Sequence, residues 1–139
     1  MLEARRKLLT TSVVGIGMIL VLTACGPQNI TADVTSYEFT MSQTEARPGD
    51  IIFTVNNVTE DELIHEFVVL QTDLAHDALP VDANGDVDEA QLTVVDEIED
   101  IEPGTTHELK VTLAAGHYVI LCNVEGHYKQ GMHADFTVK

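Results

Sequence analysis

A cysteine, a histidine and a methionine lie close together near the end of the chain. The segment 122–132 reads CNVEGHYKQGM and places Cys122, His127 and Met132 at the spacing Cys-x4-His-x4-Met. Thiolate, imidazole and thioether are soft ligands that together favour copper. Zinc is more often bound by cysteine and histidine alone. The spacing therefore predicts that one short loop, called the ligand loop below, supplies three ligands to a single copper ion.

A blue-copper site needs a second histidine, because two imidazoles and one thiolate bind in a plane with a weak axial methionine. His65 is the best candidate. It follows the polar loop at 56–62 and lies at the start of the apolar segment IHEFVVL at 64–70. An imidazole at the rim of a core needs a polar partner there. Its alternative role is that of a rim histidine satisfied by a hydrogen bond.

The remaining histidines are weaker candidates for the fourth ligand. His133 alternates onto an outward face with Asp135, so we expect it to be solvated. His117 falls on the strand face opposite Cys122. The last two are His107, expected to be a satisfied core or rim residue, and His76, which lies in an acidic insert.

The N-terminus has the pattern of an export signal. Positive residues RRK at 5–7 precede an apolar run at 13–22, and LTAC at 22–25 follows. The last four residues resemble a bacterial lipobox, which predicts a signal peptide at 1–24 and lipidation of Cys25. A plain signal peptide or an uncleaved anchor is the alternative. Lipidation of Cys25 leaves Cys122 without a disulfide partner, so Cys122 is either an inert buried thiol or a metal ligand.

Composition limits the possible functions. Without residues 1–24 the chain has 115 residues, enough for one domain with one core, and carries 4 basic and 22 acidic side chains for a formal charge of −18. Nucleic-acid binding is excluded, because phosphate recognition needs a basic face. The charge favours solubility and basic partners.

Short alternating segments separated by Pro/Gly turns predict an all-β sandwich. The expected strands are 35–41 (TSYEFTM), 51–56, 64–70, 106–113, 118–122 and the C-terminal segment with Ala134, Phe136 and Val138 inward. Residues 71–91 interrupt this pattern as an acidic insert. Its segment DANGDVDE resembles a calcium loop, but the sixth and twelfth positions are Val87 and Thr93 instead of Gly and Glu, which favours a solvated turn.

With these residues in place, the chain resembles the cupredoxins, the small blue copper proteins that include plastocyanin, azurin and auracyanin. The similarity covers IHEFVVL and the whole segment from Pro103 to Lys139. It implies a Greek-key sandwich of about seven to eight strands, at residues 32–139 after a lipidated N-terminus and linker at 25–31. The implied ligands are His65, Cys122, His127 and Met132. His127 is implied as the electron port.

One position departs from the family pattern. Many cupredoxins have Asn directly after the first histidine, where it ties the two ligand segments together, and this chain has Glu66. Ligand orientation depends on such links, so a different residue must supply this one. Gly126 and Gly131 each precede a ligand, which predicts tight backbone turns there.

The residues favour a monomeric one-electron carrier that is tethered to the membrane on the extracytoplasmic side, at the cell surface or in the periplasm. Its expected partners are redox proteins with a basic docking face, such as a cytochrome. An enzyme is not expected, since four protein ligands leave no open position for substrate. The alternatives are a copper-delivery protein without a redox role and a metal-free adhesion or sensor domain.

Overall fold

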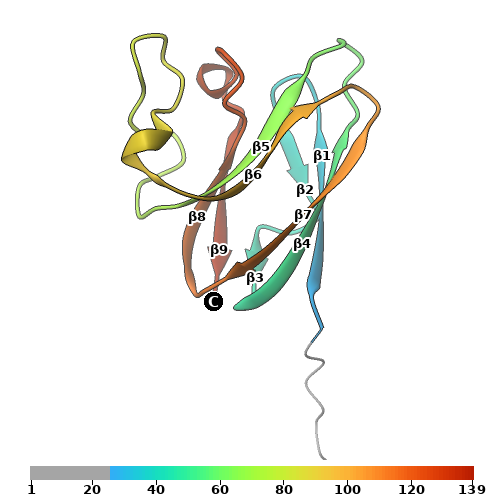
Figure 1. The fold of residues 1–139 in the computed structure, drawn as a ribbon, viewed down its shortest axis with the longest axis vertical. Coiled ribbons are helices and arrows are strands. Elements are labelled where there is room, and N and C mark those ends of the chain that lie inside the picture. The colour runs from blue at the N-terminus through green and yellow to red at the C-terminus, as the bar shows by residue number, and fades with distance from the viewer. Residues whose placement is uncertain (1–25) are drawn as a thin grey trace, which may run out of the picture.

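The structure is a computed structural model that describes residues 26–139, and it is a sandwich of two β-sheets (Figure 1). The first sheet has the order β2-β1-β4-β7 and the second the order β3-β9-β8-β5-β6. The first consists of β1 (Gln28–Val34), β2 (Phe39–Met41), β4 (Gly49–Asn57) and β7 (Thr106–Leu113). The second consists of β3 (Glu45–Ala46), β5 (His65–Gln71), β6 (Thr93–Ile101), β8 (Gly116–Leu121) and β9 (His133–Val138). The expected signal peptide and the lipidation of Cys25 lie outside the described residues.

Alternation along the strands builds the core between the sheets. Every second residue of β4 is buried, with Phe53 at its centre. The Phe53 ring lies 5.3 Å from that of Phe67 in β5 and 5.4 Å from that of Phe136 in β9, measured between centroids. Tilted and edge-on aromatic pairs of this kind stabilise the contact beyond the area they bury. These three rings therefore join the two sheets.

The predicted all-β sandwich is confirmed, with nine strands in the described part of the chain instead of seven or eight. The two-residue strand β3 was not predicted, and neither were two longer strands. One is β1, which begins at Gln28 and so extends the domain to the N-terminal side of residue 32. The other is β6, whose periodicity is hidden by two shifts in its register with β5.

The expected strand at 35–41 is shorter than predicted. Only Phe39–Met41 is extended, because the amide of Thr35 donates to the carbonyl of Glu38 and closes a turn. Tyr37 consequently does not join the inward face and keeps 39% of its surface exposed.

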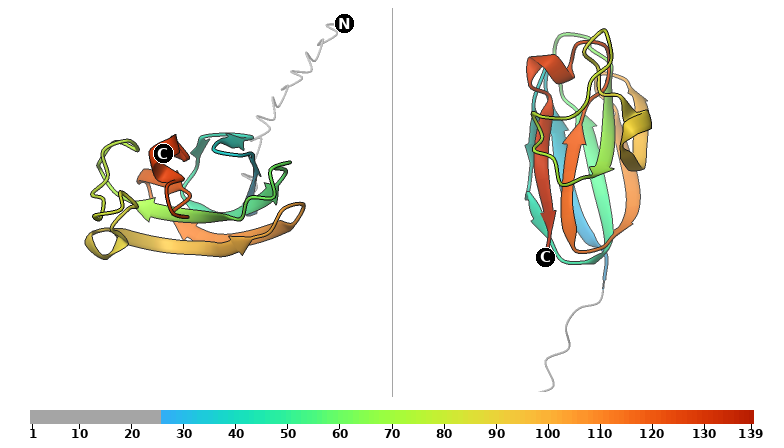
Figure 2. Two further views of the ribbon diagram at one scale, coloured as in Figure 1. Left: turned by 90° about the horizontal axis from the view of Figure 1, so that it is seen from above. Right: turned by 90° about the vertical axis from the view of Figure 1, so that its left-hand side faces the viewer.

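The acidic insert covers the outer face of the second sheet and includes a single 3-10 turn, η1 (Glu89–Gln91). Val119 and Leu121 of β8 point away from the main core but are buried, because Leu79 and Val87 of the insert pack over them. The insert and the ligand loop lie at the same end of the sandwich, opposite the C-terminus (Figures 1 and 2). None of the helical segments between residues 26 and 139 has the length and apolar character needed to span a membrane.

Candidate metal centre

The strand pairing brings the first histidine and the cysteine to one place. His65 is the first residue of β5, and Cys122 directly follows the end of β8. These strands are antiparallel neighbours, with Val68 opposite Leu121. The start of one strand therefore meets the end of the other, although the two residues are 57 positions apart in the chain.

The ligand loop folds back on itself through its own backbone. The amide of Cys122 donates to the carbonyl of Met132 at 3.1 Å, and the amide of Met132 donates to the carbonyl of His127 at 3.2 Å. A 3-10 turn, η2 (Tyr128–Gln130), lies between His127 and Met132. Gly126 and Gly131 have φ angles of 80° and 97°, in the left-handed region that glycine adopts without strain, which confirms the predicted turns.

Three predicted ligand atoms converge at this end of the sandwich. Cys122 Sγ lies 3.3 Å from His127 Nδ1 and 3.8 Å from His65 Nδ1. The three donor atoms lie within 4.8 Å of one another. Cys122 and His65 are fully buried, and His127 keeps 7% of its surface exposed. Among the described residues, this is the one group of three such side chains with the spacing for a metal ion.

The geometry suits a transition-metal ion. Bonds of about 2.0 Å to nitrogen and about 2.3 Å to sulfur, at angles of 90–120°, separate the two ligand atoms by about 3.1–3.7 Å. The two observed distances fall in or next to this range. Met132 is fully buried in the same core cluster as Cys122. Its backbone is hydrogen-bonded to the backbones of both Cys122 and His127. A soft thioether beside a thiolate and two imidazoles is the donor set of a copper site.

Burial keeps all three donors uncharged in the metal-free protein. It raises the pKa of the Cys122 thiol to about 11 and is the larger reason that the pKa of His65 falls to about 4, with nearby His127 the smaller one. Burial also lowers the pKa of His127. Both imidazoles are thus unprotonated at neutral pH, as metal ligation requires, while the thiol must lose its proton when a metal binds.

Hydrogen bonds from a backbone amide and from an asparagine side chain hold the Cys122 sulfur and the segment that carries His65. The amide of Glu66 donates to Cys122 Sγ at 3.2 Å, so the residue after the first histidine contacts the thiol through its main chain. Asn57 is buried, and its side chain donates to the carbonyl of Leu63, two residues before His65, and to that of Ile101, which pairs with His65 on β6. These bonds fix the loop that leads into β5.

The other histidines lie away from the three donors. His107 contacts Thr105, and His117 lies between the Thr72 carbonyl and Asp135, on the face of β8 opposite Cys122 as predicted. The prediction that His133 is solvated is wrong. It is half-buried, with its Nδ1 2.5 Å from that of His76, because the acidic insert covers its face of β9.

Several supporting residues were not identified from the sequence. Asn57 has a weak signal, as a polar residue at the inward position after Ile51, Phe53 and Val55. Tyr37, whose ring meets the His127 ring edge-on at 5.2 Å, has none, because the contact depends on a turn in a distant segment.

The sequence matches the model of a protein family described as copper binding proteins, plastocyanin/azurin family, over residues 27–139. No curated protein sequence matches.

Solved structures with a similar fold include reduced auracyanin from Roseiflexus castenholzii, with 21% identity, a TM-score of 0.54, and coverage of 78% of this chain and 96% of that one. Auracyanin A from Chloroflexus aurantiacus has 19% identity and a TM-score of 0.57, covering 82% of this chain and 100% of that one. Rusticyanin from Thiobacillus ferrooxidans has 18% identity and a TM-score of 0.55, covering 80% of this chain and 76% of that one. At these identities the similarity establishes the shared fold.

Proposed function

Because the chain belongs to the plastocyanin/azurin family of copper-binding proteins, we propose that it carries single electrons between larger redox proteins while it is tethered to a membrane through Cys25. It has one type 1 copper site, formed by His65, Cys122, His127 and Met132. The observation that carries the proposal is the convergence of two buried Nδ1 atoms on one buried thiol.

Bound copper supplies a one-electron change between Cu(I) and Cu(II). The protein supplies a fixed set of ligands, since rearrangement between the two states slows electron transfer. His65 is held by its strand, and the Cys122 sulfur accepts the Glu66 amide. The backbone bonds between Cys122, His127 and Met132 hold the other side of the site. No enzymatic activity is proposed, because the four side chains would fill the coordination positions of the ion and leave none for a substrate.

His127 is the proposed point of electron entry and exit. It keeps 7% of its surface exposed, whereas the other three ligands are fully buried. Of the four ligands, this ring is the one that a partner at the surface could contact directly.

The proposed partners have a basic docking face. Burial and the nearby carboxylates of Glu89, Glu97, Glu99 and Asp100 raise the pKa of Glu66, which places five acidic groups together beside the first ligand. A concentrated negative potential steers cationic partners and raises their association rate at low salt. A redox protein with a basic docking face, such as a cytochrome, is the proposed partner.

We also propose an extracytoplasmic location, with a lipid on Cys25 as the anchor. The basis is the LTAC pattern at 22–25, which follows the positive residues and the apolar run of an export signal. The first strand, β1, begins at Gln28, three residues after Cys25, so the proposed lipid would be joined to the sandwich by a short tether.

The test is a visible absorption spectrum of residues 26–139 with one equivalent of Cu(II), followed by ascorbate. We expect an intense band near 600 nm, a wavelength taken from the family, that disappears on reduction and is absent from Cys122→Ser. Stopped-flow mixing of the reduced protein with an oxidised basic cytochrome should then show transfer that slows as salt is raised. Colourless copper binding contradicts the redox role and favours delivery. Failure to bind copper refutes the ligand assignment.

A further inference from the structure

Hydrogen bonds connect the acidic insert to the ligand loop at several points. We propose that the insert is a positioning clamp, which replaces the missing link after the first histidine and fixes the ligand loop around the metal. The expected effect of the clamp on copper binding rests on the proposed copper function. The clamp itself can be tested without metal.

The C-terminal part of the insert, which includes Val87 and Glu89, is attached through Asn123, the residue after the cysteine ligand. Its side-chain oxygen accepts from the amide of Val87 at 2.8 Å, and its side-chain nitrogen donates to the carbonyl of Val87 at 3.0 Å and to Glu89 Oε1 at 2.7 Å. A side-chain amide that pairs with both polar groups of one backbone residue has a single orientation. Cys122 is therefore held on its C-terminal side by the insert.

A second contact reaches the residue before the loop histidine. The amide of Gly126 donates to Asp86 Oδ1 at 2.8 Å. Asp86 is itself held in place, because its own amide and those of Asn84 and Gly85 all donate to the carboxylate of Asp82. This internal network explains why DANGDVDE resembles a calcium loop: the Asp82 carboxylate organises the turn with backbone donors. The turn then presents Asp86 to the ligand loop.

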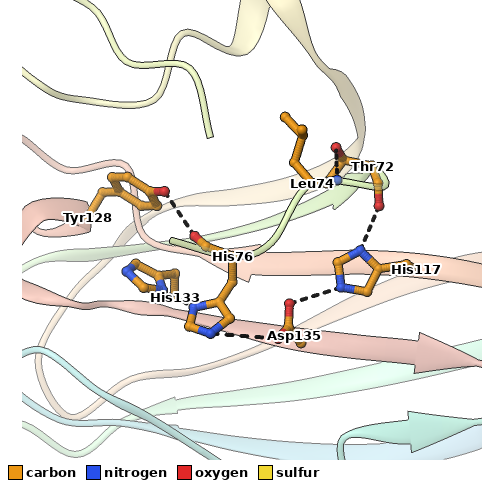
Figure 3. A network of polar contacts seen from close by, with 7 residues as sticks. All are labelled: Thr72, Leu74, His76, His117, Tyr128, His133 and Asp135. Atoms are coloured by element: carbon orange, nitrogen blue, oxygen red, sulfur yellow. Dashed lines mark hydrogen bonds and ion pairs between the residues drawn. The ribbon is translucent and has the colours of Figure 1, made fainter. Parts of the chain in front are cut away.

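The N-terminal part of the insert, which includes His76 and Leu79, is attached by tyrosine and histidine side chains (Figure 3). The Tyr128 hydroxyl, one residue after the loop histidine, accepts from the amide of Leu79 at 3.2 Å and donates to the carbonyl of His76 at 2.9 Å. The His76 ring lies beside that of His133, which directly follows Met132, and its Nε2 lies 3.6 Å from the carboxylate of Asp135.

The apolar contacts join the same partners. Tyr128 shares a buried cluster with Leu79 and Val87 of the insert and with Leu121, the residue before the cysteine ligand. Residues adjacent to all three loop ligands, namely Leu121, Asn123, Tyr128 and His133, therefore contact the insert. Outer partners of this kind orient metal ligands, and their loss usually weakens metal binding or activity by about 10- to 100-fold.

The experiment compares Asn123→Ala and Asp86→Ala with the matched control Asp88→Ala. The control removes one carboxylate from the same insert, and that carboxylate accepts from Gln91 within the insert instead of from the ligand loop. The copper-loaded proteins are mixed with excess chelator, and the decay of the thiolate–Cu(II) band is followed. We expect the first two variants to lose copper roughly tenfold faster than the wild type, and the control to lose it at the wild-type rate within about twofold. Altered hyperfine splitting in the electron paramagnetic resonance spectrum should accompany the faster loss.

Amide hydrogen exchange of the metal-free proteins gives a second measurement that needs no copper. The clamp predicts faster exchange across residues 122–132 in Asn123→Ala than in Asp88→Ala, with exchange in β4 unchanged and both proteins folded by circular dichroism. Equal exchange and equal copper loss in the test and control variants would overturn the clamp. A wild-type protein that never forms the band, but whose loop exchanges faster in Asn123→Ala, would refute the copper function and leave the clamp standing.

Discussion

The buried His65 ring makes the stability of the metal-free fold depend on pH in a calculable way. Its pKa is lowered from 6.5 to about 4 in the folded protein, chiefly by burial. Between these values the unfolded chain binds a proton that the folded chain does not, so stability is fully present above about pH 6.5 and is lost as the pH falls to about 4. At about 1.4 kcal/mol per pH unit, the loss amounts to about 3 kcal/mol.

The change His65→Gln isolates this contribution from that of the many carboxylates. The free energy of unfolding is measured by urea titration between pH 7.5 and 4, with a chelator and a reductant present. The wild type should lose about 3 kcal/mol relative to the variant over this range. His117 provides a control of opposite sign, because the Thr72 carbonyl and Asp135 raise its pKa. The wild type should therefore gain stability relative to His117→Gln as the pH falls. A difference between wild type and His65→Gln that stays constant with pH would show that the folded protein protonates His65 freely.

Four further outcomes follow from the same structure. Copper binding at pH 8 should release about one proton per ion, because the pKa of the Cys122 thiol is about 11 and both imidazoles are already neutral, and an indicator dye in weak buffer measures this release. Met132→Leu should change the stability of the metal-free protein by less than about 1.5 kcal/mol, since the buried volume is nearly conserved. The same change should raise the reduction potential in voltammetry, since Cu(II) loses a donor. Phe53→Ala should lower the free energy of unfolding by about 3–5 kcal/mol in urea, because the ring is fully buried between Phe67 and Phe136.

The parts of the fold that could be predicted are those where local pattern and burial agree. β4 and β7 alternate cleanly, because one face of each meets the core, and both were expected from that alternation. β6 was missed for the opposite reason. It is an edge strand with two register shifts and a left-handed Asp100, so its exposure pattern has no period of two.

The residues of the site also fall into those that the local sequence predicts and those that it does not. The three loop ligands are close in sequence, so their types and spacing were sufficient to group them. His65 could be chosen among the histidines by its position at the start of an apolar segment. The contacts of Asn57, Asn123 and Tyr37 join segments that are distant in the chain, and no local pattern reports such contacts. The prediction that His133 is solvated failed for the same reason. Alternation along β9 carries no information about the insert that covers this face.

The uneven origin of the ligands has a consequence for how the protein matures. Cys122, His127 and Met132 lie within eleven residues and can approach one ion in an unfolded chain, whereas His65 joins them after β5 has paired with β8. Part of the binding free energy is then available before folding, and this part cannot stabilise the folded state over the unfolded one. Copper that arrives early would close the short loop first and leave the long-range strand pairing as the slow step, as expected for contacts of large sequence separation. The imidazole that completes the site thus also reports that the sandwich has formed.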